Sequence, residues 1–265
     1  MSRFSPFGFA THMLLILSLA SFKTAAFAQA PLQEKREPIT TDRPDFTEAA
    51  IVVPRHYLQI ENGFTYQSSR RVYSLSGPET LFRYGVADRF EMRLGLPDYN
   101  RQRTGGLTAT GFSDLYLGAK YQIGPCGNGW ELSVIPAMFL PTGQHDFSSG
   151  GIDPEIKLCF SRDLSPKWDV SGMFYGSLPT ENGRRNATLQ TTLSFGWDLG
   201  RKWRMFNEYA GTFSRHAGPQ HLYHSGFTYL IHEDMQFDVH YGYGLNNNVP
   251  QSFVGAGLSF RFKTH

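Results

Sequence analysis

The chain has 265 residues, with 25 Lys and Arg against 23 Asp and Glu, 15% aromatic residues, 27 glycines and only 18% charged residues. This composition favours an all-β protein over a helical one, and the lack of any basic run argues against a nucleic-acid partner. After the N-terminus no stretch approaches 18 uninterrupted apolar residues, which excludes a helical membrane protein. The mean hydropathy of −0.34 is compatible with membrane strands, because their two faces average out.

Residues 1–28 are predicted to be a secretory signal peptide. Arg3 gives the positive start, and residues 13–20 form an apolar core that is too short to span a membrane. Ala26-Phe27-Ala28 supplies the small residues of a cleavage site, and a second site after Ala30 stays open. Cleavage after Ala28 would remove Arg3 and Lys23, which leaves a mature chain without formal net charge.

Residues 29–55 carry four prolines, many charges and little alternation, which predicts an irregular periplasmic lead-in segment. Within it, the run from Asp42 to Glu48 contains four charged residues beside a proline and a phenylalanine. Two hypotheses stay open for this run. It folds into the periplasmic mouth as a plug or gate that pairs with luminal charges, or it is a solvated linker. The candidate plug residues are Asp42, Arg43, Asp45 and Glu48.

From residue 56 to residue 262, apolar and polar residues alternate in stretches of about ten, which predicts strands with two different faces. The clearest example is 90–96, where apolar Phe90, Met92 and Leu94 alternate with Glu91 and Arg93. An even number of such strands predicts an antiparallel transmembrane β-barrel of about 12 strands. The stretches are 57–66, 79–86, 90–96, 114–123, 130–140, 152–160, 168–176, 189–197, 203–213, 221–230, 235–244 and 251–262.

Connections between these stretches alternate in length. Residues 87–89, 124–129, 161–167, 198–202 and 231–234 form short turns, whereas 67–78, 97–113, 141–151, 177–188, 214–220 and 245–250 form mostly longer loops. Short turns on one rim and long loops on the other are typical of outer-membrane barrels, with the short side periplasmic. A soluble β-sandwich or lipocalin-like barrel is the alternative, but the apolar face is too rich in bulky aromatics to fill one small interior. Asn62 and Asn207 fall on the lipid face, which predicts a bulge or a one-residue shift at each.

Several short motifs together suggest a family. They are Thr41–Glu48, Arg83-Tyr84-Gly85 with Asp88-Arg89, Gly111–Leu115, Pro141-Thr142-Gly143, Asp153-Pro154-Glu155 and the closing Val254–Phe262. In this order they resemble the bacterial outer-membrane proteins labelled as transporters of the meta-cleavage phenol-degradation pathway, over about residues 38–262. The resemblance implies an outer-membrane barrel that passes hydrophobic or aromatic compounds, and it brings no catalytic residues.

The face opposite the lipid side carries charges of both signs on most strands. These charges either form a closing network or line a narrow polar channel, and the mixture of signs favours the network. The excess of carboxylates predicts a mild cation preference for any open pathway. The candidate luminal residues are Glu61, Arg83, Glu91, Arg93, Asp114, Lys120, Asp153, Glu155, Lys157, Glu208, Asp238 and Arg261.

Other chemistry finds weaker support. The histidines at 216, 221, 224 and 232 fit no metal-ligand spacing and are interpreted as a chance surface cluster. A lipid-cleaving barrel would have to use Ser214, His216, His221, His224 or Ser225, but no nucleophile elbow, phosphate loop or zinc-protease pattern occurs. We therefore predict no enzyme, catalytic residue, cofactor or metal. Whether Cys126 and Cys159 form a disulfide or stay as two thiols is left open.

The sequence thus predicts a channel or transporter-like barrel in the outer membrane of a Gram-negative bacterium, reached through the periplasm after signal-peptide export. It would serve small solutes, with hydrophobic or aromatic ones implied by the resemblance. The expected partners are outer-membrane lipid, a small-molecule solute and, during biogenesis, the barrel-assembly machinery. A barrel enzyme acting on lipid and a structural or adhesin-like barrel remain the alternatives, and the oligomeric state is open.

Overall fold

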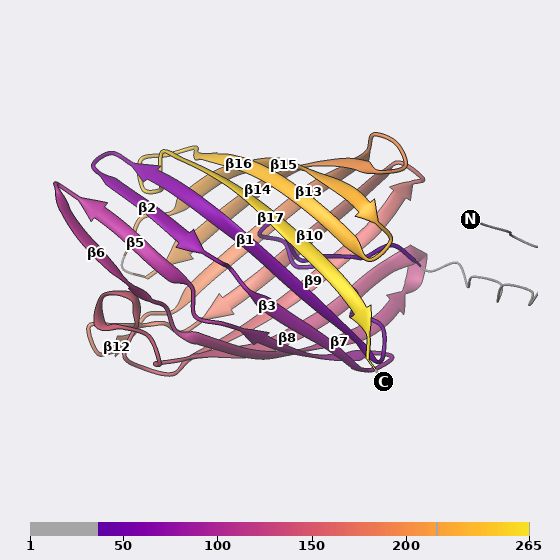
Figure 1. Ribbon diagram of the computed structural model, residues 1–265, viewed down its shortest axis with the longest axis horizontal. Coiled ribbons are helices and arrows are strands. Elements are labelled where there is room, and N and C mark those ends of the chain that lie inside the picture. The colour runs from indigo at the N-terminus through magenta and orange to yellow at the C-terminus, as the bar shows by residue number, and fades with distance from the viewer. Residues whose placement is uncertain (1–36, 216, 265) are drawn as a thin grey trace, which may run out of the picture. The chain divides into compact units, whose positions relative to one another are not determined.

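A computed structural model describes residues 37–215 and 217–264, so the predicted signal peptide and His216 lie outside the described residues. Twelve antiparallel strands form a closed barrel, because β17 pairs with β1 along twelve consecutive residue pairs (Figure 1). The strand count and the all-β fold are as predicted. In chain order the wall consists of β1 (Tyr57–Ser69), β3 (Leu81–Ala87), β4 (Phe90–Gly95), β7 (Leu115–Cys126), β8 (Trp130–Leu140), β9 (Asp153–Ser165), β10 (Trp168–Ser177), β13 (Thr188–Asp198), β14 (Trp203–Ser214), β15 (Gln220–His232), β16 (Met235–Gly244) and β17 (Ser252–Lys263).

The barrel has its apolar side chains outside and its charged side chains inside. On β16, Phe237, Val239 and Tyr241 are exposed, whereas the alternate residues Asp238 and His240 are buried. A protein in water would have the opposite arrangement, since exposing this many bulky apolar side chains costs free energy. The exposed apolar face therefore excludes the soluble sandwich and the lipocalin-like barrel. In the described part of the chain no helix is long and apolar enough to cross a membrane.

Asn62 and Asn207 do lie on the outer face, but without the predicted bulge or shift. The β1–β17 and β14–β15 registers run through both positions without interruption. Their amide oxygens instead accept hydrogen bonds from nearby hydroxyl groups. Thr80 Oγ1, just before β3, lies 2.8 Å from the Asn62 oxygen, and Tyr223 Oη on β15 lies 2.5 Å from that of Asn207. The cost of placing an amide on this face is thus reduced by a local partner.

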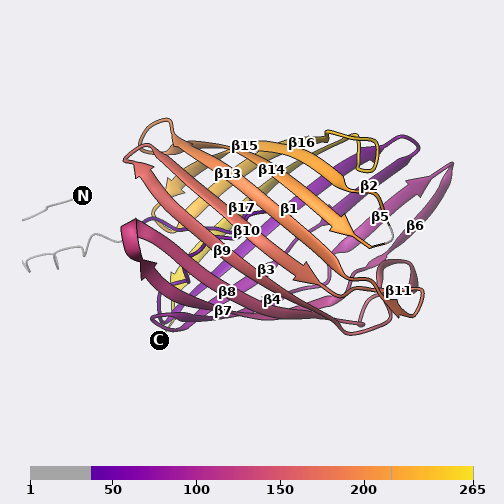
Figure 2. The ribbon, with the colours of Figure 1, turned by 180° about the vertical axis from the view of Figure 1, so that it is seen from behind.

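Two predicted loops, 67–78 and 97–113, contain further strands. These are β2 (Val72–Gly77), β5 (Tyr99–Thr104) and β6 (Leu107–Phe112), and they continue the sheet beyond β1 in the order β1-β2-β5-β6. They extend the wall at the rim opposite the short turns, as seen from both sides in Figures 1 and 2. The remaining elements are a small hairpin, β11 (Thr180–Glu181) with β12 (Arg184–Arg185), and the 3₁₀ turns Gly127–Gly129 and His145–Phe147.

The first described residues lie inside the barrel. Residues 37–54, here called the luminal segment, contain no strand and enter beside the short-turn rim, where Ile39 N–H donates to Glu233 O at 2.8 Å. At the same rim Arg261 donates to Glu37 O at 2.8 Å. Further along, Ala50 packs against a small buried cluster formed by Ile135, Cys159 and Met173.

Cys126 and Cys159 are both free thiols, so the disulfide alternative is wrong. Cys159 is fully buried, while Cys126 is partly exposed at the end of β7. We expect a thiol reagent to react quickly with one thiol, Cys126, in the folded protein that has never been reduced, and with two thiols after denaturation. Reduction before the assay should leave both thiol counts unchanged. A denatured protein that shows thiols only after reduction would contradict this assignment.

Candidate functional site: a charged lumen filled by the N-terminal segment

The Asp42 carboxylate lies at the centre of the lumen among three cations from neighbouring strands. Its oxygens are 2.6 Å from Arg93 Nη1, 3.2 Å from Arg83 Nη1 and 3.1 Å from Lys120 Nζ. All four side chains are buried. Burial alone would raise the pKa of Asp42, but the three cations hold it well below its usual value. The group is therefore ionised in the docked segment.

Backbone donors of the luminal segment meet luminal carboxylates. The amides of Asp42 and Arg43 both donate to Glu61, at 2.9 to 3.1 Å, and Val53 N–H donates to Glu91 at 2.7 Å. An irregular segment in a membrane barrel needs such partners, because its peptide groups have no ladder of their own. The wall carboxylates thus satisfy the backbone that the segment brings in.

Glu48 extends the network to the next strands. Its carboxylate bridges Arg93 Nη2 at 2.6 Å and Lys157 Nζ at 2.7 Å. Lys157 also contacts Glu155 at 3.3 Å. On this side of the lumen the four wall cations on β3, β4, β7 and β9 outnumber the three wall acids Glu61, Glu91 and Glu155. The excess is one positive charge, and the two carboxylates of Asp42 and Glu48 more than offset it.

Arg43 points to the opposite side of the lumen, where acids predominate. It forms ion pairs with Glu79 and, at 3.3 Å, with Asp238. Its guanidinium lies against Gly63 and Gly257, which face each other across β1 and β17. A Cβ built on Gly63 would lie 2.1 Å from Arg43 Cζ, and one on Gly257 would lie 2.4 Å from Arg43 Nε. Only glycine at these two positions leaves room for the docked arginine.

Glu208 binds the turn at Phe46 and Thr47. It accepts both backbone amides, at 2.9 and 2.8 Å, and the Thr47 hydroxyl at 2.6 Å. The remaining partner of Glu208 is His224 Nδ1 at 2.9 Å, and His224 Nε2 lies 2.9 Å from Nδ1 of His240. This chain of buried groups fixes the carboxylate that holds the segment.

An aromatic contact adds to this anchor. The Phe46 ring lies 4.7 Å from the His224 ring and 5.7 Å from the Phe253 ring, between centroids. Asp45, one residue earlier, has much poorer surroundings. Within the described part of the chain, its carboxylate has one side-chain hydrogen bond, a long one of 3.5 Å from Ser194 Oγ. Burial and the neighbouring Glu208 carboxylate raise the pKa of Asp45 well above its usual value.

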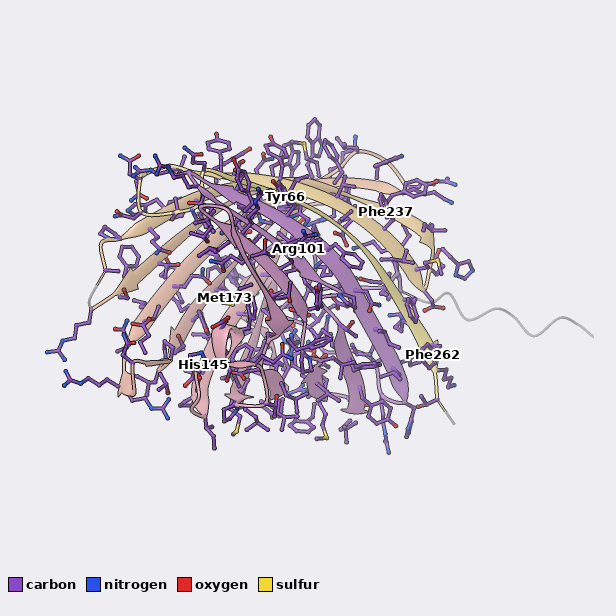
Figure 3. The ribbon with its side chains drawn as sticks, turned by 60° about the vertical axis from the view of Figure 1, so that its left-hand side comes forward. Tyr66, Arg101, His145, Met173, Phe237 and Phe262 are labelled. Carbon is purple, nitrogen blue, oxygen red and sulfur yellow. The ribbon has the colours of Figure 1, made fainter. Side chains whose placement is uncertain are left out.

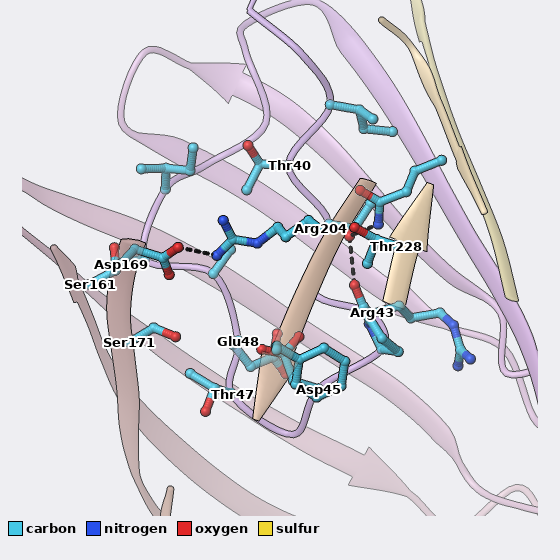
Figure 4. A pocket seen from close by; sticks show the side chains of 18 of the residues that line it. Thr40, Arg43, Asp45, Thr47, Glu48, Ser161, Asp169, Ser171, Arg204 and Thr228 are labelled. Atoms are coloured by element: carbon cyan, nitrogen blue, oxygen red, sulfur yellow. Dashed lines mark hydrogen bonds and ion pairs between the residues drawn. The ribbon is translucent and has the colours of Figure 1, made fainter. Parts of the chain in front are cut away.

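A cavity of about 400 Å³ lies between the luminal segment and the wall (Figure 4). Its wall residues come from the ends of β8, β9, β10, β14, β15 and β16 that lie near the short-turn rim. Arg204 crosses one side of it in an ion pair with Asp169. The other acids on its lining are Asp45, Glu48, Glu131 and Asp163, and its second cation is Arg43. The cavity is therefore rich in carboxylates, and both of its cations are already paired.

The structure places the twelve candidate luminal residues at different heights. Seven of them surround the luminal segment with Asp42 and Glu48, namely Glu61, Arg83, Glu91, Arg93, Lys120, Glu155 and Lys157, and Glu208 and Asp238 hold it from the other side. The last three lie away from this network. Asp114 accepts hydrogen bonds from Gly143 and Ser149, and Asp153 accepts from Thr180 and Arg185, all in connections between strands. Arg261 forms an ion pair with Asp234 and donates to the carbonyl of Glu37 at the start of the luminal segment.

The sequence analysis missed two residues of the site, His224 and His240. It placed His224 in a surface cluster, which is wrong, because His224 is fully buried in the lumen beside His240. His221, three residues earlier on β15, points to the other face and bonds Tyr209. This separation also splits the residues that a lipid-cleaving site would have needed to bring together. No group of three or more potential metal ligands occurs among the described residues.

The closed barrel with a charged, filled interior and an apolar outer face defines a transmembrane β-barrel protein. The chain belongs to the family described as "Putative MetA-pathway of phenol degradation", whose model matches residues 41–262. No curated protein matches the chain.

Solved structures share the fold at low sequence identity. An outer membrane channel from Pseudomonas putida F1 is 12% identical with a TM-score of 0.66, over 83% of this chain and 99% of that one. The NanC porin is 12% identical with a TM-score of 0.55, over 77% and 98%. The KdgM porin in complex with disordered oligogalacturonate is 10% identical with a TM-score of 0.54, over 77% and 99%.

Opposite effects are expected from two conservative changes in the luminal segment. Asp42→Asn leaves three buried cations short of a partner, which costs about 3 kcal/mol of docking free energy. Amides 42–53 should then exchange hydrogen about 100-fold faster than in the wild type. Asp45→Asn removes a carboxylate whose ionisation opposes docking, so the same amides should exchange more slowly at neutral pH. Equal exchange in all three proteins would contradict the assigned electrostatics.

The same two carboxyls predict how docking depends on pH. The pKa of Asp42 is lowered on docking, so its contribution is present above about pH 4 and is lost as the pH falls further. The pKa of Asp45 is raised, so docking weakens as the pH rises from about 4 through that raised pKa. Amide protection of residues 42–53, corrected for intrinsic exchange, should fall across this higher range in the wild type. It should stay level there in Asp45→Asn.

A side chain at Gly63 should displace Arg43. The three atoms nearest to a Cβ built on Gly63 all belong to the Arg43 guanidinium, so we expect Gly63→Val to fold as a barrel but to displace this arginine. Amides 42–53 should then exchange hydrogen faster than in the wild type. Gly176→Val, on the outer face, is the matched control, since an added Cβ there meets nothing closer than 3.9 Å. Equal exchange in both variants would show that the close approach of Arg43 is not required.

Proposed function

We propose that the protein is an outer-membrane channel for small solutes that rests closed, with residues 37–54 acting as its plug. The observation that carries this proposal is the position of Asp42, whose carboxylate joins cations from β3, β4 and β7 inside the lumen. In a purely structural barrel, wall side chains could pair with each other alone. Here the nearest carboxylate to Lys120 is that of Asp42, at 3.1 Å, whereas the wall residue Glu91 is 3.9 Å away.

The family and the fold support the same class of function. The solved proteins that share the fold are titled channel or porin, and the family description refers to phenol degradation. The predicted signal peptide, the apolar outer face and the charged lumen support a location in the outer membrane of a Gram-negative bacterium. Nothing in the arrangement of Ser225, His221 and His224 favours an enzyme acting on lipid, since they do not share one face around a cavity.

Small neutral aromatic molecules are the solutes we propose. The family description, which refers to phenol degradation, suggests aromatic solutes, and the charges that line the cavity suggest which solute charge fits. The carboxylates of Glu131 and Asp163 line the side near the short turns and form no ion pair with another described residue, whereas Arg43 and Arg204 are already paired. This surface disfavours carboxylate and phenolate anions and accepts neutral or cationic solutes.

Removal of the plug should open the barrel. Deleting residues 38–50 takes away Asp42, Arg43 and Glu48, and we expect a large, steady single-channel conductance in planar bilayers where the wild type is mostly closed. A control of unchanged length, with residues 42–48 replaced by Gly and Ser, should conduct like the deletion because it lacks the same contacts. Unchanged conductance in both variants, with barrels folded by heat-dependent gel mobility, would refute the plug.

The opened channel should prefer cations. In a tenfold KCl gradient, the reversal potential of the deletion variant should have the sign of K⁺ selectivity, since carboxylates outnumber free cations along the cavity. Neutralising Glu131 and Asp163 together as Gln and Asn should move the reversal potential toward zero. An anion preference in the deletion variant would contradict the proposed solute charge.

A further inference from the structure

We propose that the outward face of β2 and β5, together with the turn between β1 and β2, binds the phosphate groups of lipid in the outer leaflet. This surface, here called the arginine face, consists of Tyr66, Arg70, Arg71, Tyr73, Leu75, Arg101 and Arg103. The proposal that this surface binds lipid rests on the outer-membrane location proposed above, but not on conduction or on the plug.

The strand register sets the composition of the arginine face. Tyr66 pairs with Leu75, and Leu75 pairs with Arg101, so these three side chains lie in one row on one side of the sheet. Tyr73 and Arg103 form the next row in the same way. Tyr66 alternates with the inward residues of β1 and therefore points outward, which directs both rows away from the lumen. Figure 3 shows Tyr66 and Arg101 on this side of the barrel.

The four arginines have no acidic partners. Arg70, Arg71, Arg101 and Arg103 are all exposed, and none takes part in an ion pair among the described residues. Residues 66–77 and 99–112 contain no Asp or Glu at all. This contrasts with the wall arginines at 83, 93, 204 and 261, each of which faces a carboxylate. The arginine face is therefore an uncompensated positive surface.

Aromatic and apolar side chains lie beside these charges. Tyr73 and Leu75 are 44% and 42% exposed, and the next row toward the barrel contains Tyr99 and Phe112, whose ring centroids are 5.7 Å apart. Exposed tyrosines and phenylalanines are typical of the boundary between hydrocarbon and headgroups. Arginines just beyond that boundary are placed at the level of the phosphates, which their planar guanidinium groups bind through two hydrogen bonds.

A lipid fits this surface better than a soluble anion does. The charges lie on the outer side of the wall, interleaved with apolar side chains, and none of these residues lines the cavity beside the luminal segment. The inward side of these strands carries instead the neutral polar residues Ser74, Asn100 and Gln102. A surface that combines apolar contacts with unpaired cations matches a ligand with acyl chains and phosphates, which is the chemistry of phosphorylated glycolipid in the outer leaflet.

The test measures binding of bisphosphorylated lipid A to the full-length protein in detergent, by native mass spectrometry. The variant is Arg101→Gln/Arg103→Gln, and the charge-matched control is Arg184→Gln/Arg215→Gln, two exposed arginines in other connections at the same rim. We expect the first variant to bind about 30-fold more weakly than the wild type, because each of the two surface arginines should contribute about five- to sixfold. The control should bind like the wild type.

Two further measurements test whether the phosphate groups are bound and whether they must belong to a lipid. Dephosphorylated lipid A should bind all three proteins equally weakly, and inorganic pyrophosphate at millimolar concentration should not displace the phosphorylated lipid. Equal losses in both double variants, undiminished binding of the dephosphorylated lipid, or displacement by pyrophosphate would each overturn the proposal. Conductance of Arg101→Gln/Arg103→Gln after plug deletion should equal that of the deletion alone, so failure here is distinguishable from failure of the channel.

Discussion

The buried carboxylate of Asp42 is the interaction on which the rest of the lumen depends. A charge removed from water is tolerated only when opposite charges and hydrogen bonds surround it, and the same holds for Arg83, Arg93 and Lys120. These four groups come from a segment and from three strands of the wall, so each stabilises the others only while the segment is docked. The filled interior and the closed state proposed above therefore have one physical cause.

The barrel wall has glycine, which lacks a side chain, at positions where the luminal segment lies close to it. Gly63 and Gly257 leave space for Arg43, and Gly85 lies directly under the carbonyl of Pro54. The wall also supplies carboxylates such as Glu61 and Glu208 to backbone amides of the segment. An irregular backbone can thus lie at membrane depth, because it is enclosed by polar protein and not by lipid.

Alternation of polar and apolar residues and the lengths of the connections were enough to predict twelve strands, their inward charges and the rim of short turns, since each depends only on local sequence. It failed for β5, whose sequence YNRQRT has too few apolar residues to mark a strand. It also missed the pairing of His224 with Glu208 and His240, because contacts between strands depend on register, which local pattern leaves undetermined. The asparagines at 62 and 207 were misjudged for the same reason, since their hydroxyl partners, Thr80 and Tyr223, are distant in sequence.

The most direct test locks the segment to the wall. The hydroxyl oxygens of Thr47 and Thr192 are 2.6 Å apart, so Thr47→Cys/Thr192→Cys can form a disulfide in a background where Cys126 and Cys159 are serine. Conductance is then recorded in bilayers before and after reduction. The account predicts that the oxidised channel stays closed at every voltage and that reduction restores the wild-type openings. Openings of the same size and frequency in the fully oxidised protein would contradict it.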